Sequence, residues 1–117
     1  MIKVAVTGAT GFIGRELVER LSEENHQVKI LTRKNATDFP DNVEIFIGDL
    51  IHSDCPLNLF LKDCDILFHC AGETTISNAM RDVNVDGTKS LIAAALNECS
   101  QTNRKMHWVQ LSSCRVY

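Results

Sequence analysis

This 117-residue sequence has fewer basic residues than acidic ones, 12 against 15, and charges of both signs are interleaved along the chain. The sequence therefore lacks the clustered positive charge that marks a nucleic-acid-binding face. Long apolar runs are missing too, because the stretch at residues 2–13 is broken by Lys3 and by glycines and threonines. With no small-residue cleavage pattern after it, this stretch is expected to be neither a signal peptide nor a membrane span.

Repeats, linkers and low-complexity segments are also absent from the sequence, and 117 residues are enough for one independent core. We expect residues 1–117 to form a single domain. The five cysteines are an odd number and include no Cys-x-x-Cys pair, which indicates reduced thiols in the interior of a cytoplasmic protein. The four histidines are scattered, with no two spaced to share a helical face, so no metal site is expected.

Short apolar segments that suit strands alternate with segments of helical periodicity. Strands are predicted at residues 2–6, 28–31, 43–47, 66–70 and 106–111. Helices are predicted from Ile13 to a left-handed terminus at Asn25, over 57–61 and over 83–99. The apolar stripe expected on the last helix comprises Thr88, Leu91, Ile92, Ala95, Leu96 and Cys99. This alternation requires parallel pairing with right-handed crossovers, so the predicted fold class is α/β, a doubly wound parallel sheet of about five strands.

The first predicted strand leads directly into a glycine-rich turn at residues 8–14. In doubly wound sheets, ligands bind beyond the carboxyl ends of the strands, where this turn lies. Gly8 would allow the sharp turn, Gly11 the close approach of a pyrophosphate, and Gly14 the close packing of the helix on the sheet. The amides of Gly11, Phe12 and Ile13 are expected to point unpaired at the ligand, with the positive end of the helix dipole behind them. The alternative is a tight turn with no ligand.

Two residues, Ala9 and Thr10, separate the first two glycines. The resulting Thr-Gly-x-x-Gly-x-x-Gly pattern resembles the short-chain dehydrogenase/reductase superfamily, and specifically its extended branch of nucleotide-sugar epimerases, dehydratases and related reductases. The resemblance implies a Rossmann fold that binds NAD or NADP. Further segments resemble that branch in the same order along essentially the whole chain: Gly48-Asp49-Leu50, His69-Cys70-Ala71-Gly72, Asn84-Val85-Asp86-Gly87-Thr88, and Leu111-Ser112-Ser113 leading into Val116-Tyr117.

By this resemblance, the residues that border the cofactor follow the later strands. Asp49 would contact the adenine amino group, with the Leu50 amide beside it, and Ala71 and Gly72 would border the ribose next to the nicotinamide. Asn84 matches the asparagine that in this family lies near the cofactor and steadies the active site. Two structural alternatives stay open, with Asp49 as a plain turn residue and Asn84 as a helix N-cap.

A serine at the end of the fifth predicted strand is the catalytic candidate. Ser113 falls where the family keeps the serine that hydrogen-bonds the reacting hydroxyl or carbonyl, and Ser112 is the second choice. Ordinary loop chemistry is the alternative for both. The family's proton donor and its lysine form a Tyr-x-x-x-Lys pair after this serine, whereas the sequence stops at Tyr117, which matches a different tyrosine. The 117-residue chain is therefore expected to bind cofactor and to transfer hydride poorly or not at all.

The residues after the second predicted strand bear on the choice between NAD and NADP. NAD-specific sites usually place a carboxylate there to hold the ribose 2′-hydroxyl. Here Thr32 is followed by Arg33 and Lys34, two cations suited to a 2′-phosphate, which favours NADP. NAD stays open, because the alternative for Arg33 is to stack over the adenine or to lie in solvent.

Two functions follow from the resemblance. The first is the N-terminal part of an enzyme, an epimerase, dehydratase or reductase, that oxidises a sugar hydroxyl or reduces a carbonyl of a small-molecule substrate with NAD(P). The second is a non-catalytic dinucleotide sensor or interaction module. A third interpretation, a Rossmann-like domain for another adenine cofactor, explains fewer of the segments that resemble the family. The fifth strand would form an apolar sheet edge in this chain, from which we expect self-association, with a homo-oligomer as one form of it, or limited solubility.

Overall fold

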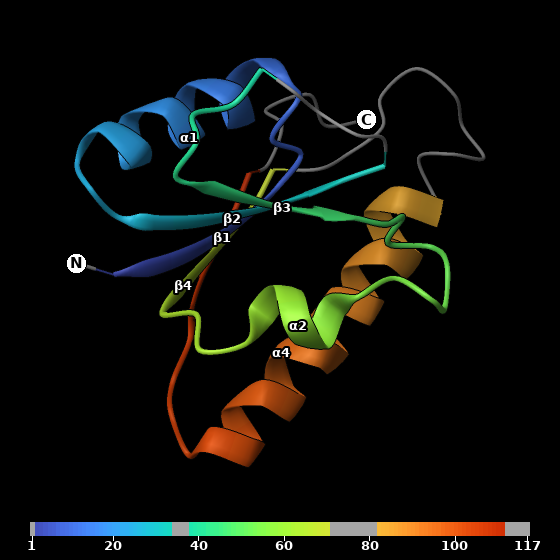
Figure 1. Cartoon of the computed structure of the whole chain (residues 1–117). Coiled ribbons are helices and arrows are strands. Elements are labelled where there is room, and N and C mark those ends of the chain that lie inside the picture. The colour runs from blue at the N-terminus through green and yellow to red at the C-terminus, as the bar shows by residue number, and fades with distance from the viewer. Residues whose placement is uncertain (1, 34–37, 71–81, 112–117) are drawn as a thin grey trace.

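Five parallel strands form one sheet at the centre of the computed structural model, which describes residues 2–33, 38–70 and 82–111. The strands are β1 (Lys3–Thr7), β2 (Gln27–Thr32), β3 (Val43–Ile47), β4 (Ile66–His69) and β5 (His107–Gln110). Their order is β3-β2-β1-β4-β5, so the chain builds outward from β1, first to one side and then to the other (Figure 1). The predicted doubly wound parallel sheet is confirmed, and each strand boundary agrees with the sequence prediction to within one residue.

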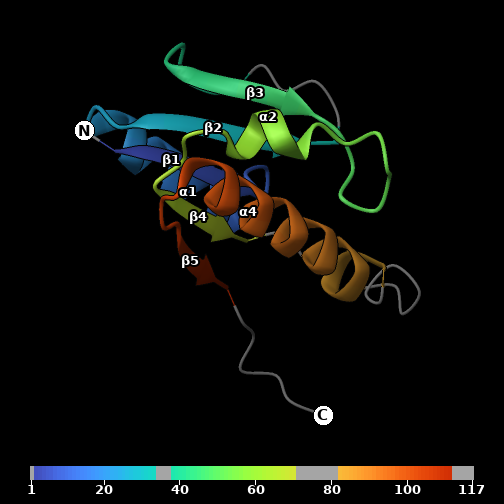
Figure 2. The ribbon, with the colours of Figure 1, turned by 90° about the horizontal axis from the view of Figure 1, so that it is seen from below.

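Helices cover both faces of this sheet (Figure 2). α1 (Phe12–Glu23) packs on one face, and α2 (Leu57–Leu61) and α4 (Thr88–Thr102) pack on the other. A π-helical segment, η1 (Asp82–Gly87), runs directly into α4, so the helix predicted over 83–99 corresponds to these two elements. Asn25 has a φ of 63° and follows α1 in the left-handed conformation expected of it. None of the helices in the described parts of the chain is long and apolar enough to cross a membrane.

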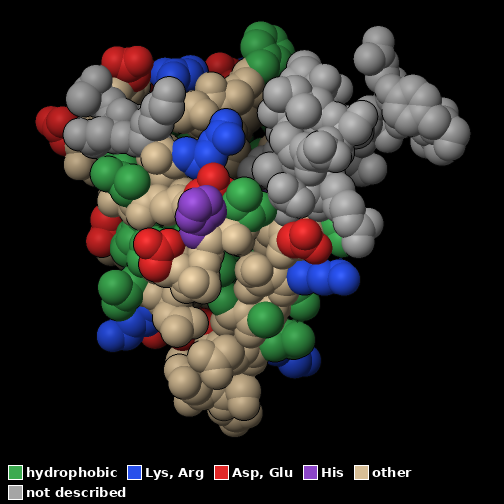
Figure 3. Space-filling view, turned by 90° about the vertical axis from the view of Figure 1, so that its right-hand side faces the viewer, with side chains coloured by type: hydrophobic (Ala, Val, Ile, Leu, Met, Phe, Trp, Pro, Cys, Tyr) green, Lys and Arg blue, Asp and Glu red, His purple; other side chains and the backbone are tan. Residues whose placement is uncertain are grey.

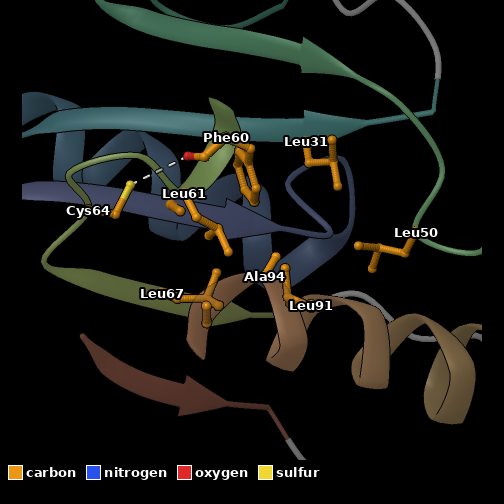
Figure 4. Packing of buried hydrophobic residues seen from close by; sticks show 10 residues of the cluster. Leu31, Leu50, Phe60, Leu61, Cys64, Leu67, Leu91 and Ala94 are labelled. Carbon is orange, nitrogen blue, oxygen red and sulfur yellow. Dashed lines mark hydrogen bonds between the residues drawn. The ribbon is translucent and has the colours of Figure 1, made fainter. Parts of the chain in front are cut away.

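Alternate residues of the central strands point to opposite faces and build two separate clusters. Val6 packs with Val18 of α1 on one face. Ala5 packs with Phe60 of α2 and Leu91 of α4 on the other face, where side chains from both helices and the sheet converge (Figure 4). Because all of these side chains are buried, the clusters hold the sheet and its helices together and fix the loops that leave the carboxyl ends of the strands.

The buried stripe of α4 differs from the predicted one. Leu91, Ala94 and Ala95 are buried, whereas Ile92 and Leu96, which were expected on the same stripe, are 42% and 66% exposed. The apolar residues of α4 span a wide arc, and only the part of that arc that meets α2 and the sheet is covered. Helical periodicity alone does not specify which part of such an arc is covered.

A buried lysine fastens α2 to the sheet. Lys29 lies in the middle of β2 and is 8% exposed, and its Nζ donates hydrogen bonds to the carbonyl oxygens of Leu59 and Lys62, at 2.8 and 3.2 Å. The same ammonium group lies 5.3 Å from the centroid of the Phe46 ring. A cation suits this place because it lies at the negative end of the helix dipole, where the Leu59 carbonyl oxygen otherwise accepts a longer bond of 3.4 Å from the Lys62 amide. The apolar pattern of β2 gives no sign of this contact.

The segment between β2 and β3 is fastened to α1 at two points. The guanidinium carbon of Arg15 lies 5.2 Å from the centroid of the Phe39 ring. Nearer the end of α1, the Ser22 hydroxyl donates a hydrogen bond of 2.6 Å to the side-chain oxygen of Asn42. These contacts connect the two ends of α1 to the chain that leads into β3.

Candidate functional site

The carboxyl end of β1 passes into α1 through the predicted glycine turn. Gly8 has a φ of 69°, in the left-handed region that glycine adopts at no steric cost. The Gly11 amide donates a hydrogen bond of 3.1 Å to the Gly8 carbonyl oxygen, and the Arg15 amide donates the first helical bond to the Gly11 carbonyl oxygen, at 3.0 Å. The strand therefore turns into the helix at the middle of the sheet, between β2 and β4.

Gly14 is the glycine whose side chain would meet the backbone. A Cβ atom at this position would lie 2.1 Å from the Gly8 carbonyl oxygen, a distance that no side chain tolerates. At Gly11 the corresponding distance to the same oxygen is 3.3 Å, and Gly11 itself is exposed. Gly14 thus lets α1 pack closely on the turn that follows β1, and Gly11 presents bare backbone at the surface.

The amides at the start of α1 differ in one respect from the prediction. The Gly11 amide is not unpaired, because it closes the turn onto Gly8. Phe12 and Ile13 are the first two residues of α1, so their amides have no intrahelical acceptor, and no side chain of the described residues caps this end of the helix. The side chains of Phe12 and Ile13 are 96% and 50% exposed. Two of the three expected amides therefore remain as candidate donors to an anion.

The loops after β2 and β3 lie beside each other at the same edge of the sheet. The Gly48 amide donates a hydrogen bond of 2.8 Å to the carbonyl oxygen of Thr32, and Arg33, the next residue, is exposed. Asp49 stabilises its own turn, because its side-chain oxygen accepts a hydrogen bond of 3.3 Å from the Ile51 amide. The turn interpretation of Asp49 is thus realised, and a role toward adenine stays a prediction.

Leu50 anchors the same loop. Its side chain is 7% exposed and belongs to the cluster between the sheet and the two helices α2 and α4 (Figure 4). Because Leu50 is held in the core, the backbone of Asp49 and Leu50 is fixed in place beside the ends of β2 and β3. The predicted role of the Leu50 amide beside the adenine requires only backbone, so it is compatible with this burial.

A histidine at the end of β4 contacts side chains of three other elements, β1, α4 and β5. His69 Nδ1 lies 2.6 Å from the Thr7 hydroxyl at the end of β1, and Nε2 lies 2.9 Å from the Thr88 hydroxyl at the start of α4. Its ring also contacts the edge of the Trp108 ring in β5, with the ring centroids 5.8 Å apart. His69 is 2% exposed, and burial lowers its pKa, so the ring is neutral at neutral pH. Sequence reasoning missed this role.

Three of the described cysteines carry thiols that are protonated and therefore unreactive at neutral pH. Desolvation raises the pKa of Cys55 and of Cys64 to about 11, and it also raises the pKa of Cys70, which directly follows β4. A thiol with a raised pKa is protonated at neutral pH and is a poor nucleophile and metal ligand. In the part of the chain that the structure describes, no three His, Cys, Asp or Glu side chains are grouped so that they could hold a metal ion.

Several predicted site residues lie outside the described residues, namely Lys34, Ala71, Gly72, Ser112 and Ser113. Asn84 lies within the helical backbone of η1, two residues after its start, and therefore not at the cap of α4, where Gly87 stands. Figure 3 looks at the side of the molecule toward which β2 and β3 run, and charges of both signs are spread over its described part. The other described candidates all lie at or next to the carboxyl ends of β1, β2 and β3: Gly8, Gly11, Phe12, Ile13, Gly14, Thr32, Arg33, Asp49 and Leu50.

Comparison of the sequence with known proteins identifies a family and several relatives of this chain. A family model described as "NAD dependent epimerase/dehydratase family" matches residues 4–117. The chain is 36% identical over 99 residues to a putative dihydroflavonol 4-reductase of Synechocystis sp., covering 77% of this chain and 28% of that protein. It is 30% identical over 98 residues to a putative UDP-glucose 4-epimerase of Methanocaldococcus jannaschii, covering 76% of this chain and 32% of that protein.

Among solved structures, a short-chain dehydrogenase of Leptospira borgpetersenii serovar Hardjo-bovis with bound NAD+ has the same fold. It matches with a TM-score of 0.79 at 24% identity, over 93% of this chain and 50% of that one. The chain therefore spans about a third or less of the two curated relatives, 28% and 32% of their length, and half of the solved structure.

Proposed function

The chain belongs to the NAD dependent epimerase/dehydratase family, and from that premise we propose that it binds NAD or NADP at the carboxyl edge of its sheet, with the pyrophosphate at the start of α1. The observation that carries the proposal is the glycine turn after β1. It sits in the middle of the sheet, where the order of strands reverses, which is where doubly wound sheets bind their ligands.

The residues at this turn fit a pyrophosphate. The amides of Phe12 and Ile13 lack intrahelical acceptors and lie at the positive end of the helix dipole, so the donor set suits an anion. The backbone of Gly11 is exposed, and a side chain there would occupy the space above the turn. Of the three glycines, Gly8 and Gly14 shape the turn, and Gly11 leaves room for the ligand.

The second part of the proposal concerns the adenosine half of the ligand. The ends of β2 and β3 are joined through Thr32 and Gly48, which brings Arg33 and the loop of Asp49 and Leu50 to one place beside the turn. No carboxylate follows β2 at the position where an NAD-specific site has one, and the exposed guanidinium of Arg33 is available to a 2′-phosphate. We therefore propose that NADP is preferred over NAD.

The proposed reaction is that of the family. The bound cofactor supplies hydride transfer, and the protein supplies binding, orientation and the exclusion of water. For this chain, the proposed substrate is a sugar hydroxyl of a nucleotide sugar or a related carbonyl, and Ser113, with Ser112 as the second choice, is the residue proposed to hold the reacting oxygen. The two curated relatives are named as a putative reductase and a putative epimerase. Their names support this class of reaction and do not distinguish between reduction and epimerisation.

A non-catalytic dinucleotide sensor or interaction module is the alternative that the glycine turn also allows. The coding sequence after residue 117 distinguishes the two. A Tyr-x-x-x-Lys pair encoded there supports the enzyme, and a stop codon directly after Tyr117 supports the module.

The binding proposal is tested by comparing Gly11→Val with the parent chain. The backbone of Gly11, with φ −77° and ψ 173°, is one that valine adopts, and its Cβ atom would lie 3.3 Å from the Gly8 carbonyl oxygen, so the turn has to shift by only a few tenths of an ångström. Calorimetric titration with NAD and with NADP is expected to show affinity weakened by on the order of tenfold or more, about 1.4 kcal/mol.

The matched control for this experiment is Ala93→Val, which adds the same side chain at an exposed position of α4 away from the turn. It is expected to bind as the parent does. Circular dichroism establishes that both variants are folded. The proposal is wrong if the parent binds neither dinucleotide, or if Gly11→Val binds both as tightly as the parent.

A further inference from the structure

His69 lies at the point where the two halves of the sheet meet. In the register of the sheet it is the residue of β4 directly opposite Thr7, the last residue of β1. The main chains of the two strands are joined there by a hydrogen bond of 3.2 Å from the Cys70 amide to the Thr7 carbonyl oxygen. The contact between the Thr7 hydroxyl and His69 Nδ1, at 2.6 Å, joins the same two strands through their side chains.

The other nitrogen of His69 contacts the start of α4. Nε2 lies 2.9 Å from the hydroxyl of Thr88, the first residue of α4, directly after η1. Because Thr7 is followed at once by Gly8, His69 connects the beginning of the glycine turn to the junction of η1 with α4 through two hydrogen bonds. Among the described residues, the hydroxyls of Thr7 and Thr88 are the side-chain hydrogen-bond partners of this ring.

We propose that His69 is a positioning residue of the dinucleotide site, which fixes the glycine turn relative to the η1–α4 junction by holding Thr7 and Thr88 at the same time. This inference rests on the proposed function, because it assigns a role toward the dinucleotide. It adds a residue that acts on the glycine turn through the two threonines.

The chemistry of the three side chains suits this role. A neutral imidazole has one nitrogen that donates and one that accepts, and a threonine hydroxyl does either, so both contacts are satisfied whichever tautomer is present. Every buried side-chain nitrogen and oxygen in the described residues has a hydrogen-bond partner, including both nitrogens of this ring. The position of the ring is therefore determined on both sides, and Trp108 contacts it as well.

The same contacts would serve a purely structural role, so the experiment separates affinity from stability. Thr88→Val keeps the shape of the side chain and removes the hydroxyl, whereas Thr88→Ser keeps the hydroxyl. Calorimetric titration with NADP and NAD is expected to show affinity weakened by on the order of tenfold in Thr88→Val and within about twofold of the parent in Thr88→Ser.

Ser22→Ala is the matched control for stability. It removes one side-chain hydrogen bond of 2.6 Å to Asn42, at the end of α1 that lies away from the turn. Urea unfolding of all variants measures the loss of stability. Ser22→Ala is expected to unfold more easily than the parent and to bind the dinucleotide equally well.

The outcomes distinguish the two proposals. If the parent binds neither dinucleotide, the proposed function is overturned and this inference with it. If the parent binds and Thr88→Val binds equally well, or if Ser22→Ala loses as much affinity as Thr88→Val, only the role of His69 is overturned. Should Thr88→Val fail to fold, Thr88→Ala, which removes the hydroxyl and adds no bulk, takes its place with the same expected and contradicting results.

Discussion

The α-carbon of Gly14 faces the carbonyl group of Gly8 so closely that a methyl group on Gly14 would lie 2.1 Å from the carbonyl oxygen. Gly14→Ala must therefore displace either the turn or the start of α1, and we expect the free energy of unfolding to fall by about 1–3 kcal/mol or more. Urea denaturation measures this loss. Gly11→Ala is the control, because its methyl group would lie 3.3 Å from the same oxygen and is expected to cost much less.

Lys29 is predicted to be important for stability although it is charged and lies in a strand. In Lys29→Met the carbonyl oxygens of Leu59 and Lys62 lose their hydrogen bonds from the ammonium group, and Leu59 keeps the longer bond of 3.4 Å from the Lys62 amide, so we expect a loss of about 1–3 kcal/mol of unfolding free energy by urea denaturation. Lys62→Met makes the same chemical change at an exposed side chain and is expected to be close to neutral. Equal losses in the two variants would contradict the role assigned to Lys29.

The stability of the chain is predicted to depend on pH through His69. Burial lowers the pKa of His69 below its ordinary value of 6.5, so the unfolded chain takes up a proton at a higher pH than the folded chain does. The contribution of His69 to stability is therefore complete above the unfolded pKa, decreases as the pH falls from there to the folded pKa, and stays lost below it.

Measuring the free energy of unfolding between about pH 7.5 and 5.5 tests this dependence, since the interval brackets the ordinary histidine pKa. The parent is expected to lose more stability over the interval than His69→Gln, which carries an uncharged amide in place of the ring. Parallel curves for the two proteins would show that His69 does not contribute to the pH dependence.

Self-association is predicted at the edge of the sheet. β5 is the last strand in the order of the sheet and pairs with β4, and Val109 in β5 and Leu111 directly after it are 37% and 46% exposed. Val109→Lys places a charge on this edge, which is expected to disfavour pairing between chains. Light scattering at high concentration should show larger particles for the parent than for this variant. Gln101→Lys, which adds the same charge at an exposed position of α4, is the control and should scatter as the parent does. A parent that stays monomeric would refute the prediction.

The preference for NADP is predicted to depend on Arg33. Calorimetry of the parent is expected to give tighter binding of NADP than of NAD, and Arg33→Ala is expected to remove the difference by weakening NADP binding alone. Arg20→Ala, which removes an exposed arginine far along α1 from the turn, is the control. Equal affinities for the two dinucleotides in the parent would contradict the assignment.

The parts of the fold that the sequence predicted are those that depend on local chemistry. The runs at β1 to β5 are short and apolar, and the spacing of Gly8, Gly11 and Gly14 determines a turn whatever surrounds it. The left-handed Asn25 at the end of α1 is equally local.

The parts that the sequence did not predict depend on neighbours distant in the chain. The exposure of Ile92 and Leu96 depends on how α4 lies against α2, and the pairing of the Gly11 amide depends on the geometry of the finished turn. His69 is separated by 62 residues from Thr7, so only the pairing of β1 with β4 brings the two together. The one local indication of its role in the sequence was that His69 is a polar residue at the end of an otherwise apolar strand.

The central position of β1 also determines how a ligand at the glycine turn would act on the rest of the protein. β1 is paired along its length with β2 on one side and β4 on the other, so its amides are released to solvent only when the whole sheet opens. A molecule that binds the turn only in the folded chain lowers the population of that open state in proportion to its occupancy. Its presence would therefore slow hydrogen exchange at every amide of the sheet that exchanges only through this open state, including amides in strands that it does not touch.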